Sequence, residues 1–200
     1  MSKNYEELLP EGYKEIFHIN AKDKKTGLLF TLFSFILTIL PLAIVLPIYL
    51  CTRDFKLEIS LKSYLYLLGF LVAMITYVIL HELVHGIAYK ALTKQKLTFG
   101  LSWSCAYCGV PNIYVYRKTS IIALIAPFAV FSLVFGGLLV WFYFLNGVLY
   151  ILMSFLFSIH IGGCVGDLFM FGLFLFKYKD NSILMKDTGP EQFLYQKILE

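Results

Sequence analysis

Long apolar runs alternate with shorter polar segments along the chain, and this alternation predicts its elements. Four runs have the length that an α-helix needs to cross a membrane, which is about 20 apolar residues. They cover roughly residues 28–50, 64–89, 120–145 and 148–176. Only Asn146 and Gly147 separate the last two runs, which predicts a tight helical hairpin. The pattern therefore predicts an all-α integral membrane protein with four transmembrane helices.

The ends of the chain are polar and mixed in charge. The expected division is an N-terminal arm at 1–27, a transmembrane domain at 28–176 and a C-terminal tail at 177–200. The tail is expected to end in a short amphipathic helix near residues 193–199. Pro41 and Pro47 are expected to kink the first helix or to end it early, because proline removes a helical hydrogen bond.

The longest internal polar segment, residues 90–119, contains a different period. Between residues 96 and 103, every second side chain is apolar and would point to one side: Leu97, Phe99, Leu101 and Trp103. Such alternation is typical of a half-buried strand. A turn signal at 109–112 precedes a second short stretch at 113–116. The segment predicts a β-hairpin-like element, or two short strands, between the second and third helices, with a surface-packed loop as the alternative.

Composition supports the membrane assignment. Hydrophobic residues make up 59% of the chain and charged residues 15%. A soluble fold of this size could not cover its surface with so few charges, so the lipid bilayer is the expected surrounding. The net charge of +4 is not concentrated in a basic stripe that could follow phosphates, which argues against a nucleic-acid partner.

The distribution of positive charge predicts the orientation. With four spans, the arm, the 90–119 segment and the tail lie on one side, and they carry 14 of the 17 Lys and Arg residues. Cytoplasmic segments are enriched in Lys and Arg. We therefore expect a multi-pass protein of the cell membrane with both termini in the cytoplasm.

Ionisable residues inside the second apolar run indicate chemistry. His81 and His85 are four residues apart, so they lie on one face of a helix, one turn from each other. Two imidazoles in this arrangement can share a zinc ion. Glu82 lies about 100° round the helix from His81, where its carboxylate could take a proton from metal-bound water. The expected cofactor is one zinc ion per chain.

Asp167 in the fourth run is the expected third ligand. His81 lies nine residues before Lys90, which places it about 14 Å inside the membrane from that end of its helix. Asp167 lies ten residues before Lys177, about 15 Å deep by the same helical rise. The two residues should therefore lie at one level. A lone carboxylate at mid-helix costs about 2.5–3.5 kcal/mol on insertion scales, which favours a partner such as a metal.

Small residues and a third histidine surround Asp167. Gly162 and Gly166 are four apart, a spacing that lets helices pack closely. A hydrogen bond from Asp167 to a backbone group is the structural alternative to metal binding. His160 is the alternative third ligand, although it would lie about 10 Å deeper than Asp167 on an unbroken helix.

These residues resemble two related groups of proteins. His81-Glu82-Leu83-Val84-His85 is the zincin signature, and its place in a transmembrane helix resembles the site-2 intramembrane zinc metalloproteases. More closely, the chain resembles a bacterial membrane family of proposed zincin peptidases. The features that carry this resemblance are Leu9–Tyr13, His81–Gly86, Tyr107–Pro111, Ala126–Phe128 and His160–Asp167. Unlike the site-2 pattern, Gly166 precedes the aspartate and Leu168 follows it.

The resemblance implies zinc held by His81, His85 and Asp167, with Glu82 as general base. The expected function is an intramembrane zinc metallopeptidase acting on membrane-associated or membrane-spanning proteins. The hairpin would hold an extended substrate, and the expected substrate-binding residues are Leu97, Phe99, Leu101 and Asn112. Two alternatives stay open: an inactive zinc-binding adaptor, and a transporter lined by His81, His85, His160 and Asp167.

Overall fold

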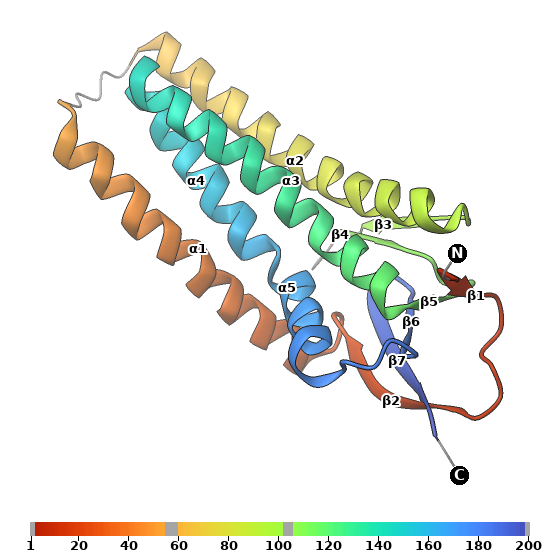
Figure 1. The fold of residues 1–200 in the computed structure, drawn as a ribbon. Coiled ribbons are helices and arrows are strands. Elements are labelled where there is room, and N and C mark those ends of the chain that lie inside the picture. The colour runs from red at the N-terminus through yellow and green to blue at the C-terminus, as the bar shows by residue number, and fades with distance from the viewer. Residues whose placement is uncertain (1–2, 55–59, 102–105, 199–200) are drawn as a thin grey trace. The chain divides into compact units, whose positions relative to one another are not determined.

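Helices dominate the computed structural model, which describes residues 3–54, 60–101 and 106–198 (Figure 1). The chain divides into two units. The first contains Met1–Phe30, Leu80–Pro127 and Gly166–Glu200. The second contains Thr31–Ile79 and Phe128–Val165.

The apolar runs form helices close to the predicted bounds. The helices are α1 (Lys24–Thr52), α2 (Leu61–Thr93), α3 (Arg117–Leu145), α4 (Gly147–Gly163) and α5 (Val165–Gly172), and α5 continues into a π-helix at Leu173–Lys177. Three of them, α1, α2 and α3, are long and apolar enough to cross a membrane. The count becomes four if α4 and the bent segment Val165–Lys177 form one span. The chain is thus compatible with a membrane protein that has several membrane-crossing helices.

The fourth predicted helix is not continuous. It breaks at Cys164, and its two parts are bent by 42°. Of the two effects expected of Pro41 and Pro47, an early end of α1 is wrong, because the helix continues past both prolines to Thr52; a kink stays a prediction. The break predicted between the third and fourth runs is present. Asn146 is the N-cap of α4, and its side chain accepts a hydrogen bond from the Leu149 amide at 3.0 Å.

The first unit contains a sheet that the all-α prediction missed. Its five strands lie in the order β1 (Tyr5–Glu6), β5 (Tyr114–Tyr116), β6 (Leu184–Asp187), β7 (Glu191–Lys197) and β2 (Tyr13–Asn20). All of its pairs are antiparallel. The expected amphipathic helix at 193–199 is wrong, because residues up to Lys197 belong to β7. Gly189, with a φ of +97°, and Pro190 make the turn that lets β7 pair with β6 instead.

Of the two forms predicted for the 90–119 segment, two short strands are confirmed, and a hairpin between them is wrong. A strand forms at β3 (Thr98–Leu101), and a strand also forms at β5, but the two do not pair. Instead β3 pairs with β4 (Ala106–Gly109) in a separate sheet of two strands. Trp103 lies outside the described residues. The turn signal at 109–112 thus separates two sheets rather than two strands of one hairpin.

A buried apolar core supports the first unit. Strands, α3 and the π-helix all contribute to it, and its fully buried members include Val110, Val115, Ala123, Phe174 and Leu194. The aromatic ring of Tyr89, near the end of α2, is 1% exposed within this core. The core therefore anchors the part of α2 that carries the two histidines.

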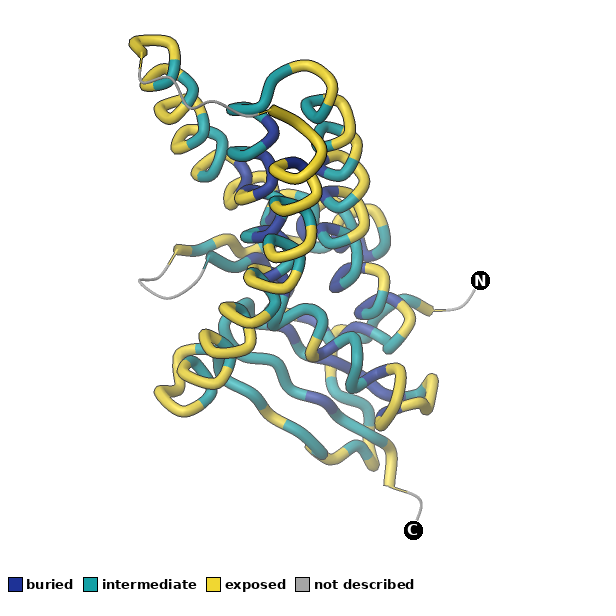
Figure 2. Tube along the Cα trace, turned by 90° about the vertical axis from the view of Figure 1, so that its left-hand side faces the viewer, coloured by how far each residue is buried: buried dark blue, intermediate teal, exposed yellow. Residues whose placement is uncertain are grey.

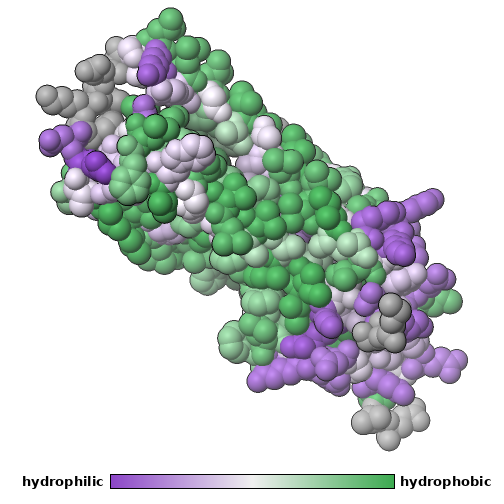
Figure 3. All heavy atoms as spheres, turned by 45° about the horizontal axis from the view of Figure 1, so that its top comes forward, coloured by the Kyte–Doolittle hydropathy of each residue, from purple (hydrophilic) through white to green (hydrophobic). Residues whose placement is uncertain are grey.

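The second unit is helical and apolar on its outside. In the described part of the chain, Tyr49 is the one buried residue of α1, and exposed positions recur along the helices (Figure 2). Hydrophobic side chains cover the helical surface on the face drawn in Figure 3. Gly162 carries the close packing: a Cβ there would lie 2.5 Å from the carbonyl oxygen of Ser34. At Gly166 the nearest atom would be 3.8 Å away, so the predicted close approach exists only at Gly162.

Candidate metal centre

The helix α2 presents both predicted histidines to the interior of the first unit. His81 is 8% exposed and His85 is 7% exposed. Their ring centroids lie 5.0 Å apart, as expected for residues one helical turn from each other. A helix of apolar residues therefore holds two imidazoles close together and away from solvent.

Asp167 meets both histidines. Its Oδ2 atom lies 3.3 Å from Nε2 of His81 and 3.3 Å from Nε2 of His85. A charge-assisted hydrogen bond is usually shorter, about 2.7–2.9 Å. Two ligands of a tetrahedral zinc ion, each at about 2.0–2.1 Å from the metal, lie about 3.3–3.4 Å apart. These distances and the donor set of two imidazoles and a carboxylate fit a zinc ion.

The helix that carries Asp167 is fixed at its far end. Arg117, the first residue of α3, donates from Nη2 to the carbonyl of Phe174 at 2.8 Å and from Nε to the carbonyl of Tyr178 at 3.0 Å. Such cationic contacts satisfy the free carbonyls at a helix C-terminus. They join α3 to the segment that follows Asp167 and so limit its movement.

A backbone carbonyl fixes the tautomer of His85. Its Nδ1 atom lies 2.9 Å from the carbonyl oxygen of Ala123 in α3. A carbonyl oxygen can only accept, so Nδ1 carries the proton and donates it. The lone pair of the neutral ring is then on Nε2, the atom that faces Asp167. His85 is therefore held in the form that binds a metal through Nε2.

Glu82 lies beside the histidines and is tied to the two-stranded sheet. Its side chain is half-buried. The carboxylate accepts a hydrogen bond from the backbone amide of Cys108 in β4. This contact joins the predicted general base to a strand and restricts the orientation of the carboxylate.

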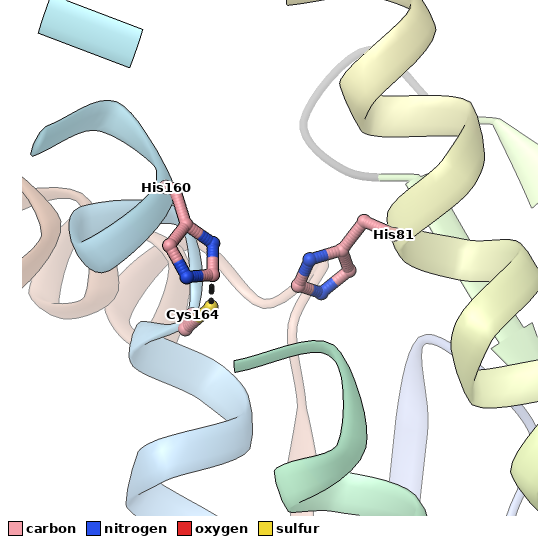
Figure 4. Close-up of side chains that lie close together, drawn as sticks. All are labelled: His81, His160 and Cys164. Atoms are coloured by element: carbon pink, nitrogen blue, oxygen red, sulfur yellow. Dashed lines mark hydrogen bonds between the residues drawn. The ribbon is translucent and has the colours of Figure 1, made fainter. Parts of the chain in front are cut away.

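His160 occupies a different environment, inside the second unit. Its Nδ1 lies 2.9 Å from the hydroxyl of Tyr77, and its Nε2 lies 3.1 Å from the hydroxyl of Ser132. Its Nδ1 also lies 3.6 Å from Sγ of Cys164, at the break between α4 and α5 (Figure 4). Both ring nitrogens of His160 thus have hydrogen-bond partners, whereas Asp167 faces both histidines of α2.

The four predicted substrate-binding residues separate into two groups. The side chains of Leu97 and Phe99 lie against Gly86, where a Cβ would be 3.1 Å from Cδ1 of Leu97 and 2.7 Å from Cζ of Phe99. They therefore pack β3 and the residue before it onto α2 at Gly86, the residue that follows His85. Leu101 is 83% exposed, and Asn112 is also exposed. The strand is thus attached to the metal helix at one end and accessible at the other.

Asp187 links three elements: the five-stranded sheet, the two-stranded sheet and α2. Its Oδ2 accepts from the hydroxyl of Tyr89 at 2.6 Å, and its Oδ1 accepts from the amide of Gly189 at 2.9 Å. Its backbone carbonyl accepts from the amide of Val110 at 2.8 Å. Asp187 therefore connects the end of α2 with the end of β4.

Sequence reasoning missed three of these contacts. The carbonyl of Ala123 and the amide of Cys108 are backbone groups, which leave no signal in residue type. Asp187 is an isolated acidic residue in a polar tail. It is buried because the tail forms strands, which the sequence did not predict.

The fold and the site define a class: a chain with helices able to cross a membrane and with the His-Glu-x-x-His donor arrangement of a metallopeptidase. The chain belongs to the family described as "Putative zincin peptidase", whose sequence profile matches residues 74–183, more than half of its length. This matched region contains all three candidate ligands and Glu82. No curated protein and no solved structure matches the chain. Family membership indicates a zinc-dependent metallopeptidase.

The buried carboxyl of Asp187 predicts a pH effect on stability. Burial raises its pKa to about 6, although the hydrogen bonds from Tyr89 and Gly189 favour the ionised form. The folded chain therefore binds this proton more tightly than the unfolded chain does. The stability gained in this way is full below about pH 4 and is lost as the pH rises through about 6.

Thermal unfolding in detergent between pH 4 and pH 8 measures this effect. Relative to the Asp187→Asn variant, the wild type should lose stability across this range, by an amount on the order of 3 kcal/mol. Asp180→Asn is the control, because the pKa of this exposed carboxyl is lowered by the hydrogen bonds that Ser182 donates to it. A constant difference between wild type and Asp187→Asn would contradict the assignment.

Proposed function

We propose that the chain is an intramembrane zinc metallopeptidase that hydrolyses peptide bonds of membrane-associated or membrane-spanning proteins. One observation carries the proposal. Nε2 of His81 and Nε2 of His85 each lie 3.3 Å from the same oxygen of Asp167, and Glu82 follows His81 directly on the helix. An adaptor that only binds zinc would have no need of a carboxylate in that position.

The residues have distinct roles in this proposal. His81, His85 and Asp167 hold the zinc ion. When bound, zinc lowers the pKa of water and polarises the carbonyl of the peptide bond. Glu82 takes a proton from the attacking water and later delivers it to the leaving amine. The Cys108 amide holds the Glu82 carboxylate, which keeps it oriented for both transfers.

The sheet supports the proposed orientation. Strands β1 and β2 come from the N-terminal arm, β5 from the internal segment, and β6 and β7 from the tail. Because all five belong to one sheet, these segments would lie on one side of a membrane. They also carry 14 of the 17 Lys and Arg residues, so both termini would lie in the cytoplasm of a multi-pass cell-membrane protein. Water and substrate would reach the site from that side.

The strand β3 is the proposed contact for the substrate. In the described part of the chain it pairs with β4 alone, so its second edge offers backbone groups to an extended peptide. A peptide added to this edge would be held straight beside α2, where Phe99 packs against Gly86. Leu97, Leu101 and Asn112 complete the proposed contact surface.

Metal analysis of the purified protein tests the ligand set. We expect about one zinc ion per chain in the wild type and loss of most of it in His81→Ala and Asp167→Ala, because each removes one of three protein ligands. His18→Ala is the control, since His18 stacks on Phe193 in the strands β2 and β7. Full zinc content in Asp167→Ala would move the third ligand to another residue, with His160 the first to test. A wild type without zinc would instead favour the transporter alternative.

The role of Glu82 is tested by separating metal content from activity. Glu82→Gln keeps the size of the side chain and removes its proton-accepting ability. We expect an unchanged zinc content and a loss of at least about 100-fold in cleavage of a membrane-spanning test peptide in detergent, measured by mass spectrometry of the products. Glu15→Gln, in the exposed part of β2, should change neither quantity. Cleavage by Glu82→Gln at the wild-type rate would remove this residue from the mechanism.

The strand contact predicts a specific kinetic change. Leu101→Ala should raise KM for the same test peptide, by up to about tenfold, and leave kcat and zinc content unchanged, because it removes apolar contact with the bound peptide. Leu133→Ala is matched to it, since this leucine is 79% exposed on α3. Equal KM values for the two variants would argue against β3 as the substrate strand.

A further inference from the structure

A proline lies inside α3 at a position that affects His85. The helix runs from Arg117 to Leu145, and Pro127 is in its interior. In an α-helix, the carbonyl of each residue accepts from the amide four residues later. The partner of the Ala123 carbonyl would be the amide of residue 127, but proline has no N–H. The carbonyl of Ala123 therefore lacks its usual helical donor.

The donor that this carbonyl meets instead is His85. The distance from Nδ1 of His85 to the oxygen of Ala123 is 2.9 Å. Ala123 is 0% exposed, and Pro127 is less than 2% exposed. Water therefore cannot replace the missing helical hydrogen bond, and the imidazole satisfies a buried carbonyl that would otherwise be costly to leave without a partner.

We propose that Pro127 is a positioning residue of the metal centre: by withholding its amide hydrogen it leaves the Ala123 carbonyl to His85, which fixes the His85 ring with Nε2 toward Asp167. This inference rests on the proposed zinc-binding function. It assigns to the proline a role beyond bending the helix. The carbonyl acts as an outer partner of the metal ligand, of the kind that sets both ring orientation and protonation state.

The consequence of replacing Pro127 follows from competition for one oxygen. With alanine at 127, a backbone N–H would point along the helix at the Ala123 carbonyl. The helical bond would then weaken or lengthen the contact with Nδ1 of His85, and the ring would be free to turn or to change tautomer. Loss of an outer partner typically reduces metal affinity 10- to 100-fold. Because the carbonyl remains present, we expect the lower end, about tenfold.

Zinc affinity of the full-length protein in detergent, measured by chelator competition, tests the inference. Pro127→Ala should bind zinc about tenfold more weakly than the wild type. Replacing Pro127 with lactic acid, the α-hydroxy acid analogue of alanine, gives a second variant, in which an ester oxygen stands where alanine has its N–H. Both variants lack the proline ring and differ only in the donor. The ester variant should therefore recover affinity close to that of the wild type.

Pro47→Ala is the matched control, because Pro47 is also inside a long helix but belongs to α1. It should leave zinc affinity unchanged. Equal affinity of Pro127→Ala and wild type would overturn the inference and leave the proposed function intact. Equal weakening in the alanine and ester variants would also overturn it, since the ring rather than the missing donor would then matter. Absence of zinc uptake by the wild type would overturn both proposals.

Discussion

The convergence of two imidazole nitrogens on one carboxylate oxygen is the interaction on which the other features depend. An aspartate within apolar helices is costly unless it has a partner of opposite charge or a metal. Oδ2 of Asp167 lies 3.3 Å from Nε2 of both histidines. Contact with these two imidazoles offsets the free-energy cost of burying the carboxylate. Each remaining contact then limits one member: Ala123 holds His85, Arg117 holds the end of the helix of Asp167, and Cys108 holds Glu82. The site is thus held mainly by backbone groups of neighbouring elements.

The sheet of the first unit supplies a second constraint. Its strands come from the two ends of the chain and from the segment between α2 and α3. The chain leaves this sheet after β2, forms α1 and α2, and returns to the sheet at β5. It leaves again after β5, forms α3, α4 and α5, and returns at β6. Asp187 ties the sheet to the end of α2 through Tyr89, so the position of this end of α2 depends on the sheet.

The sequence predicted the helices well because a span of apolar residues is a strong local signal. It predicted the histidine pair from helical spacing, and it placed Asp167 near that pair from its depth and from the small residues around it. The sheet was missed for a physical reason. Its strands are two to eight residues long, and β2 pairs with β7 from the other end of the chain with an irregularity between Glu15 and Phe17. Neither the pairing nor the irregular register has a local period to detect.

The break of the fourth helix at Cys164 illustrates the same limit. The apolar pattern continues through it, because lipid-facing composition does not record where a helix bends. Pro127 shows the converse: a proline in an apolar run marks a missing amide, but the side chain that uses the freed carbonyl is 38 residues away in the sequence. Local signals therefore identified the chemical groups, and the fold determined which backbone atoms orient them.

X-ray absorption spectroscopy at the zinc edge tests the central claim most directly, because it reports the atoms bound to the metal. We predict only nitrogen and oxygen neighbours at about 2.0–2.1 Å, with the outer scattering of two imidazole rings. A sulfur neighbour at about 2.3 Å, which would place a cysteine on the metal, would contradict it. A spectrum without imidazole scattering would contradict it equally.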